Sequence, residues 1–325
     1  MRKVLFATTA LATVAGAVAV ANAEVSISGS VEWRYMSVSD DDTAQASDSD
    51  FQATNDITIS MSSTTDNGLT ISQYINIGNG AVGTSESSIS GDFGTIAFNQ
   101  DSGGAHAASS FDVTSGGVAG GHGDPSFTLY DGSGSAVTKV EIDEAQIDDS
   151  EDGALNYFSP TFAGFQFGFG TSHLDHADDN TSTSMGAKYS GSMGDVSYSV
   201  GYASYDGTGT DIEGTHTGVN VSFSGLSLGA GSSTNKDGNA LEKETISYSA
   251  KYAVSDVLTV AVGQSNSEND NGGTKLEAAN TTISAAYTIA PGLVLNISSH
   301  DFEYKSGGSV ANDGQAIQSE LKMSF

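Results

Sequence analysis

The chain contains no cysteine, only three prolines and only 11 basic residues against 40 acidic ones. The absence of cysteine excludes disulfides, zinc–thiolate centres and cysteine nucleophiles. Beyond the N-terminal segment no stretch approaches about 18 consecutive apolar residues, which excludes a membrane-spanning helix there. The acidic excess argues against nucleic acid as a partner, because a polyanion would be repelled.

The N-terminus has the features of an export signal. Arg2 and Lys3 precede an uncharged apolar run that ends in Ala21-Asn22-Ala23, an A-x-A cleavage site. We therefore expect a signal peptide over residues 1–23 and a mature chain that starts at Glu24. A membrane anchor helix is the alternative, which the short run and the small residues at its end disfavour. Cleavage would leave 9 basic and 40 acidic residues, a formal charge of −31.

The C-terminal segment from Gln315 to Phe325 alternates between apolar and polar side chains from Ile317 onward, with Ser319 as the one polar residue on the apolar face. A strand has a side-chain period of two, so this segment predicts a strand with one apolar and one polar face. The apolar face carries Ile317, Leu321, Met323 and Phe325, and the polar face carries Gln318, Glu320, Lys322 and Ser324. A chain that ends on such a strand with phenylalanine is typical of outer-membrane β-barrels.

The same period recurs along the whole mature chain, in about sixteen short segments. Tight turns and longer acidic or glycine-rich connections alternate between them, as in a transmembrane barrel. The pattern predicts an all-β fold, a 16-stranded antiparallel transmembrane β-barrel over residues 24–325. A soluble acidic β-sandwich is the alternative. The longest interruption, about residues 101–152, is too long for an ordinary connection and indicates a functional loop.

Several motifs along the chain resemble those of Gram-negative general porins, particularly the alphaproteobacterial, Rhodobacter-type branch. Ser90–Ile96 resembles the turn between their fourth and fifth strands, and Tyr157–Phe165 resembles the turn between the sixth and seventh. The mature start Glu24-Val25, the turn Thr64–Leu69 and the final Phe325 fit the same family. The resemblance covers the whole mature chain.

The resemblance implies a trimeric diffusion pore whose long third loop folds into the lumen and faces basic residues across a constriction. The acids of that loop are the candidate constriction residues: Asp112, Asp124, Asp131, Glu141, Asp143 and Glu144. Alternation along the strands places a second set of charged residues on the lumen wall: Glu32, Arg34, Asp56, Lys188, Lys251 and Lys322. Phe325 is the expected assembly signal. The chain departs from the family in lacking an arginine cluster.

These features predict a porin of the Gram-negative outer membrane that passes small hydrophilic solutes and prefers cations, with no enzymatic activity. The expected partners are outer-membrane lipid, lipopolysaccharide and two further copies of the chain in a homotrimer. No cofactor is expected, although acidic loops such as Ser39–Asp50 favour weak binding of Ca²⁺ or Mg²⁺. The alternative function is a non-conducting barrel that acts as a structural or adhesive surface protein.

Overall fold

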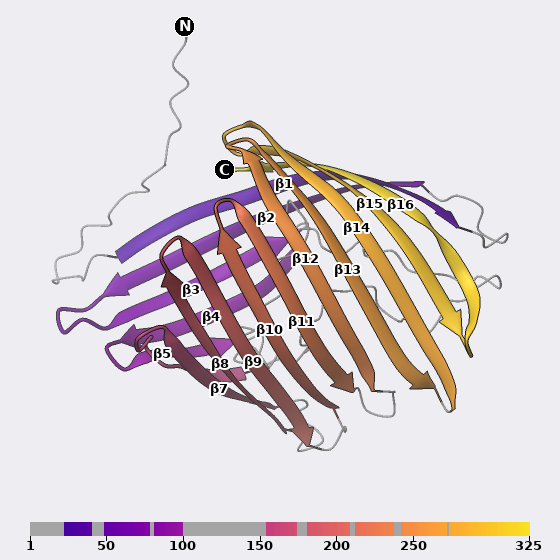
Figure 1. Cartoon of the computed structure of the whole chain (residues 1–325). Coiled ribbons are helices and arrows are strands. Elements are labelled where there is room, and N and C mark those ends of the chain that lie inside the picture. Colours follow the sequence, from indigo (N-terminus) through magenta and orange to yellow (C-terminus); the bar gives the residue numbers. More distant parts are fainter. Residues whose placement is uncertain are drawn as a thin grey trace, which may run out of the picture.

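The computed structural model describes residues 23–40, 49–78, 81–99, 154–173, 181–208, 212–236, 242–271 and 273–325. These residues form a closed barrel of antiparallel strands (Figure 1). In chain order the strands are β1 (Ala23–Asp40), β2 (Ser49–Thr64), β3 (Thr70–Gly78), β4 (Ala81–Gly91), β5 (Gly94–Asn99), β6 (Ala154–Phe158), β7 (Phe165–His173), β8 (Thr181–Met193), β9 (Val196–Thr208), β10 (Ile212–Phe223), β11 (Leu226–Lys236), β12 (Lys243–Ser255), β13 (Leu258–Asn271), β14 (Thr274–Ala290), β15 (Leu293–Ser306) and β16 (Ser309–Ser324).

Each strand pairs with its neighbours in the sequence, and β1 also pairs with β16, so the sheet has no open edge. Closure matters in a bilayer, because an unpaired edge would leave backbone groups without hydrogen-bond partners. The predicted sixteen-stranded antiparallel barrel is therefore confirmed. Two connections, Ala163-Gly164 and Ser224-Gly225, have positive φ at both residues, the type I′ geometry that matches the twist of a hairpin.

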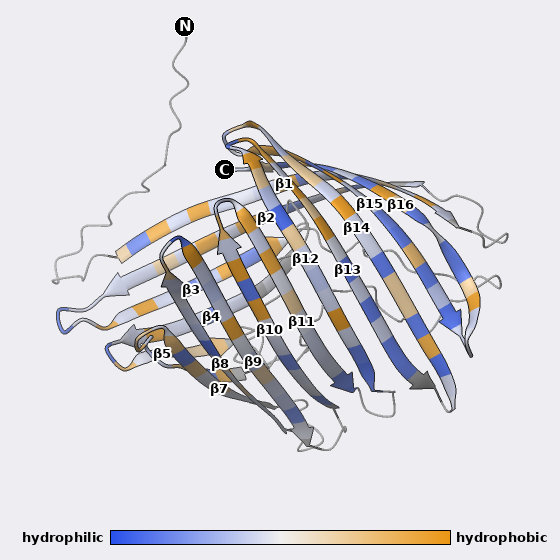
Figure 2. Cartoon of the chain, viewed as in Figure 1, coloured by the Kyte–Doolittle hydropathy of each residue, from blue (hydrophilic) through white to orange (hydrophobic). Residues whose placement is uncertain are grey.

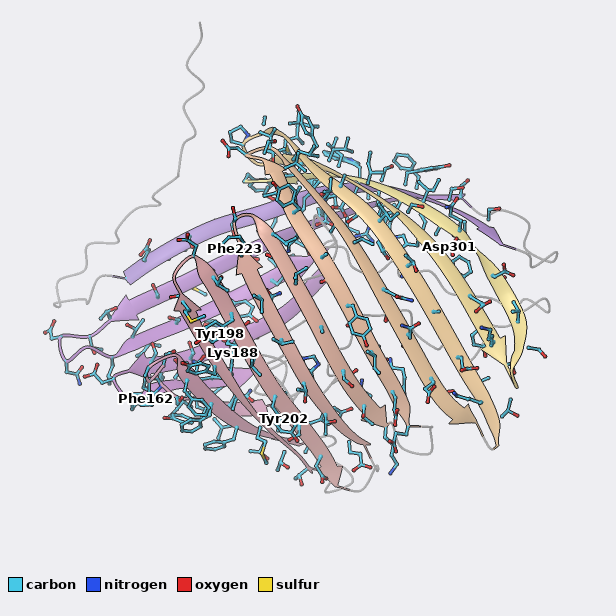
Figure 3. All side chains as sticks on the ribbon, viewed as in Figure 1. Phe162, Lys188, Tyr198, Tyr202, Phe223 and Asp301 are labelled. Carbon is cyan, nitrogen blue, oxygen red and sulfur yellow. The ribbon has the colours of Figure 1, made fainter. Side chains whose placement is uncertain are left out.

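The two faces of the barrel have the reverse of a soluble protein's polarity. Large apolar side chains stand exposed on the outer face, among them Phe169 at 58% and Ile283 at 64% exposure. Most buried side chains are instead polar and belong to the inner face, such as Ser247 and Asn280. Lipid rather than water explains an apolar outer surface of this extent. Figure 2 shows the apolar positions frequent toward the ends joined by short turns, and Figure 3 shows side chains gathered around Phe162.

The expected alternation of short and long connections is only partly correct. β3 and β4 are separated by two residues, as are β13 and β14, and β15 and β16. The polar segments beyond the apolar band continue as paired strand, so that β1 has 18 residues and β14 has 17. Backbone pairing does not require apolar side chains. A change from apolar to polar residues on the outer face therefore does not show where a strand ends, and the sequence pattern made some connections look longer than they are.

The seam between the chain's two ends is closed by a pair of reciprocal backbone hydrogen bonds. The Gly29 amide donates to the Phe325 carbonyl at 2.9 Å, and the Phe325 amide donates to the Gly29 carbonyl at 3.0 Å. A Cβ atom placed on Gly29 would lie 2.9 Å from Cζ of the Phe325 ring. The terminal ring thus lies over a glycine of the first strand, which explains the gap that this glycine leaves in the apolar face of β1.

Candidate functional site on the inner wall of the barrel

Four charged residues form one cluster on the inner wall where the first and last strands meet. Glu32 and Arg34 come from β1, and they lie directly opposite Lys322 and Glu320 of β16. Lys322 Nζ lies 2.6 Å from Glu32 Oε1, and Arg34 Nη2 lies 3.3 Å from Glu320 Oε2. Arg34 Nη2 is also 3.6 Å from Glu32 Oε2. The cluster is electrically neutral, and its signs alternate.

Neutral side chains donate further hydrogen bonds to the two carboxylates in this cluster. Asn296 Nδ2 donates to Glu320 Oε1 at 2.9 Å, and Thr54 Oγ1 donates to Glu32 Oε2 at 3.4 Å. The side chain of Glu320 is only 1% exposed, whereas that of Arg34 is 20% and that of Lys322 is 37% exposed. A carboxylate buried this deeply needs both its ionic partner and its hydrogen bonds, since desolvation disfavours an isolated charge.

A row of neutral hydrogen bonds continues along the inner wall of β14 and β15. Asn280 Nδ2 donates to Thr282 Oγ1 at 3.1 Å, and Thr282 Oγ1 lies 2.9 Å from Nδ1 of His300. His300 Nε2 lies 2.9 Å from Ser298 Oγ. Because the Thr282 oxygen already accepts from the amide, its own proton is available to Nδ1, which favours the tautomer with hydrogen on Nε2. Both ring nitrogens of His300 therefore have partners on the wall, and the side chain is fully buried.

The remaining predicted wall residues lie on the same inner face: Asp56 is on β2, next to β1, whereas Lys188 and Lys251 lie farther around the ring. Asp56 is on β2, and its Oδ1 lies 2.7 Å from the position that a Cβ atom would take on Gly78. Lys188 is on β8 and Lys251 is on β12, and both are half-buried. In the ring order β8 lies opposite β16. The structure therefore brings together only Glu32, Arg34 and Lys322 of the six.

The predicted constriction acids lie outside the described residues, as do residues 1–22 and most of the acidic stretch after β1. Those assignments stay predictions: Asp112, Asp124, Asp131, Glu141, Asp143 and Glu144. Within the described part of the chain, no group of three or more histidine, aspartate or glutamate side chains could hold a metal ion. The role of Phe325 as an assembly signal also stays a prediction.

Sequence reasoning did not select Glu320, Asn296 or His300 as site residues. Alternation along β15 and β16 assigns all three to the polar face, so the period alone could have placed them on the inner wall. The contact of Asn296 with Glu320 and that of His300 with Thr282 depend on which residues face each other across β14, β15 and β16. That register cannot be read from one strand.

Among the described residues, no helix is long and apolar enough to span a bilayer.

A closed barrel with an apolar outer surface and a polar, charged inner wall defines the class of outer-membrane β-barrel proteins. The sequence model of the Gram-negative porins matches residues 7–307. The chain belongs to the Gram-negative porin family, and it is a multi-pass β-barrel of the outer membrane. The family's fold and activity are those of non-enzymatic channels.

Solved porin structures share this fold at low sequence identity. The anion-selective porin from Comamonas acidovorans superposes with a TM-score of 0.65 at 15% identity, over 94% of this chain and 100% of that one. A triple mutant of the Rh. blastica porin gives 0.62 at 16% identity, over 93% and 100% of the two chains. The outer membrane protein OmpT of Vibrio cholerae, in its trimer form, gives 0.64 at 10% identity, over 93% and 99%. No curated protein is similar enough in sequence to be matched.

Proposed function

We propose that the barrel is a water-filled pore for passive diffusion of small polar solutes and ions, and that it prefers cations. The observation that carries the preference is the position of Arg34, the one arginine left after the predicted cleavage. Its guanidinium is held between the carboxylates of Glu32 and Glu320. A guanidinium compensated in this way offers little attraction to an anion in the lumen.

The excess of acidic residues supports the same preference. The predicted mature chain has 40 acidic residues and 9 basic ones, and carboxylates beside a low-dielectric wall are screened less than those on an open surface. Lys188 and Lys251 oppose this effect, but they are two charges on separate strands. The Comamonas acidovorans porin of the same fold is described as anion-selective, so the barrel architecture does not itself decide the sign.

Reversal potentials across a KCl gradient in a planar bilayer test the proposal. We expect K⁺ to pass more readily than Cl⁻, with a preference that decreases as the salt concentration rises. Neutralising five acids of the long third loop together should weaken the preference further: Asp124, Asp131, Glu141, Asp143 and Glu144. As a matched control, neutralising Asp66 and Asp195, which lie in short turns outside the barrel wall, should leave it unchanged. Anion preference in the wild type would reject the proposal.

The same recording separates this function from the alternative of a non-conducting surface barrel. A structural or adhesive barrel requires no open lumen and predicts no current under any salt condition. A pore predicts stepwise conductance increases as single proteins insert. We propose no enzymatic activity and no resident cofactor, and weak binding of Ca²⁺ or Mg²⁺ only at the acidic loops.

We also propose a homotrimer embedded in outer-membrane lipid and lipopolysaccharide. The support is a short-strand region with polar residues on its outer face: β5 has 6 residues, β6 has 5, and Gln73, Ser85 and Ser87 point outward from β3 and β4. Polar side chains suit contact with protein better than contact with acyl chains. Crosslinking in detergent should trap three copies, and Gln73→Arg should weaken the trimer while leaving the monomeric barrel folded.

A further inference from the structure

A single register row crosses six neighbouring strands on the inner wall, and we call it the flat row. It consists of Asn156 on β6, Gly170 on β7, Ser184 on β8, Tyr205 on β9, Gly214 on β10 and Asn235 on β11. Each member lies directly opposite the next. Its side chains are hidden rather than exposed to the lumen: Asn156 is 0%, Tyr205 is 6% and Asn235 is 8% exposed.

The space that a side chain would take at each of the two glycines of the flat row is filled by side chains of the neighbouring strands. A Cβ atom on Gly214 would fall well inside contact with the Tyr205 ring, and it would lie 2.8 Å from Asn235 Oδ1. A Cβ atom on Gly170 would collide with the Asn156 amide and lie 2.9 Å from Ser184 Oγ. In each case the side chains that face the glycine from its two neighbouring strands both reach over the glycine backbone. The side chains therefore run along the wall instead of projecting from it.

Tyr205 shows what this arrangement does for the lumen. Side chains normally stand roughly perpendicular to a sheet, so an inward tyrosine would project its ring into the barrel. Here the ring edge lies over Gly214, because Cδ1 is 3.0 Å from the missing Cβ position. Only a glycine leaves room for a ring in that place. A large residue is thereby kept out of the path of a solute.

We propose that Gly214 and Gly170 are positioning residues that set the width of the lumen at the level of the flat row, and hence the ease with which large neutral solutes pass it. The proposal rests on the proposed pore function and extends it to size selection. A methyl group on Gly214 would displace the Tyr205 ring toward the lumen, because the backbone of β9 and β10 is held by continuous pairing. The solutes that sense this change are neutral sugars near the size limit, since small ions pass a partly narrowed pore.

A matched control exists on the outer face of the barrel, between β8 and β9. Gly191 of β8 lies opposite Tyr198 of β9, and a Cβ atom there would be 2.7 Å from the Tyr198 hydroxyl and 2.8 Å from Cζ. This glycine and ring form the same kind of pair, but they face the lipid. Gly191→Ala should therefore perturb packing without changing the lumen.

The test is liposome swelling with arabinose, glucose, sucrose and raffinose, together with single-channel conductance in about 1 M KCl, where screening makes conductance report width more than charge. Gly214→Ala should slow entry of the larger sugars by about threefold or more relative to arabinose and lower the conductance by roughly a third. Gly191→Ala should match the wild type. Gly214→Ala combined with Tyr205→Ala should recover wild-type entry, since the displaced ring is gone.

Gly170→Ala provides a second variant, because its added methyl meets only the flexible ends of Asn156 and Ser184. It should narrow the pore less, and Asn156→Ala should relieve it. Wild-type sieving in folded Gly214→Ala and Gly170→Ala would overturn the proposal, as would equal narrowing by Gly191→Ala or no rescue by Tyr205→Ala. A wild type without any conductance would instead reject the pore function itself.

Discussion

The contact between Gly29 and Phe325 makes a quantitative prediction about barrel closure. A Cβ atom on Gly29 would lie 2.6 Å from the backbone oxygen of Asp56, 2.9 Å from Phe325 Cζ and 3.1 Å from Phe325 Cε2. The carbonyl belongs to β2, so relief requires the backbone of β1 or β2 to move. Forcing a methyl group into such a site costs about 1–3 kcal/mol of unfolding free energy.

The two hydrogen bonds of the seam lie at the same residue and would be strained by that movement. Each contributes about 1 kcal/mol net, so if straining removes about half of that from both bonds, we expect Gly29→Ala to lower the unfolding free energy by roughly 2–4 kcal/mol in total. Removing the ring with Phe325→Ala relieves only part of the clash. The cost of Gly29→Ala should therefore fall by about 1 kcal/mol in that background, as a double-mutant cycle would show.

Urea unfolding in phospholipid vesicles measures this cost, with Trp33 as the probe. It is the only tryptophan of the chain, and it lies on β1 opposite Leu321 of β16, close to the seam. Gly263→Ala is the control, because the nearest atom to its added Cβ is the Tyr248 carbonyl oxygen at 3.6 Å. That variant should be neutral or slightly stabilising. Equal unfolding curves for Gly29→Ala and Gly263→Ala would refute the reasoning.

Three further outcomes are expected. Ala163 has φ of 50°, so Ala163→Asn should raise the unfolding free energy by about 0.5–1 kcal/mol in the same urea assay, and a decrease would contradict the type I′ assignment. Arg34→Met should cost about 3 kcal/mol by leaving the buried Glu320 without its cation, and Glu320→Gln should recover most of it. Intact-mass measurement of the membrane-inserted protein should give the mass of a chain that starts at Glu24. A mass that includes residues 1–23 would favour the alternative, in which the N-terminal segment is a membrane anchor helix.

The fold could be predicted from the sequence because a strand's period of two is a local property. Residues such as Ile283 and Tyr287 recur on one face of β14 with Thr282 and Ser284 on the other, and the apolar face never turns to charge within the lipid band. The strand ends were less predictable. Lys275 and Glu277 continue the strand pairing beyond the band, because strand pairing is made by the backbone and tolerates charged side chains in water.

The site was predictable only one residue at a time. Period two assigns Arg34 to the inner face, but it does not say that Glu320, 286 positions away, lies opposite. That contact exists only because the first strand pairs with the last. The glycines of the inner wall were unpredictable for the same reason, since Gly214 is informative only once Tyr205 is known to face it. Register and ring closure are properties of the whole barrel, and no single segment contains them.

Charge and width should be separable in this pore, because they depend on different parts of the wall. The ionic cluster lies on β16 and β1, whereas the flat row runs from β6 to β11. Arg34→Met changes one charge without moving a wall side chain of β9, so it should shift the KCl reversal potential toward K⁺ and leave the entry of raffinose unchanged. Gly214→Ala moves an uncharged ring, so it should slow raffinose and leave the reversal potential unchanged. If either variant altered both properties equally, the narrowest part of the pore would have to include residues from both arcs of the wall, and the assignment of width to the flat row alone would be wrong.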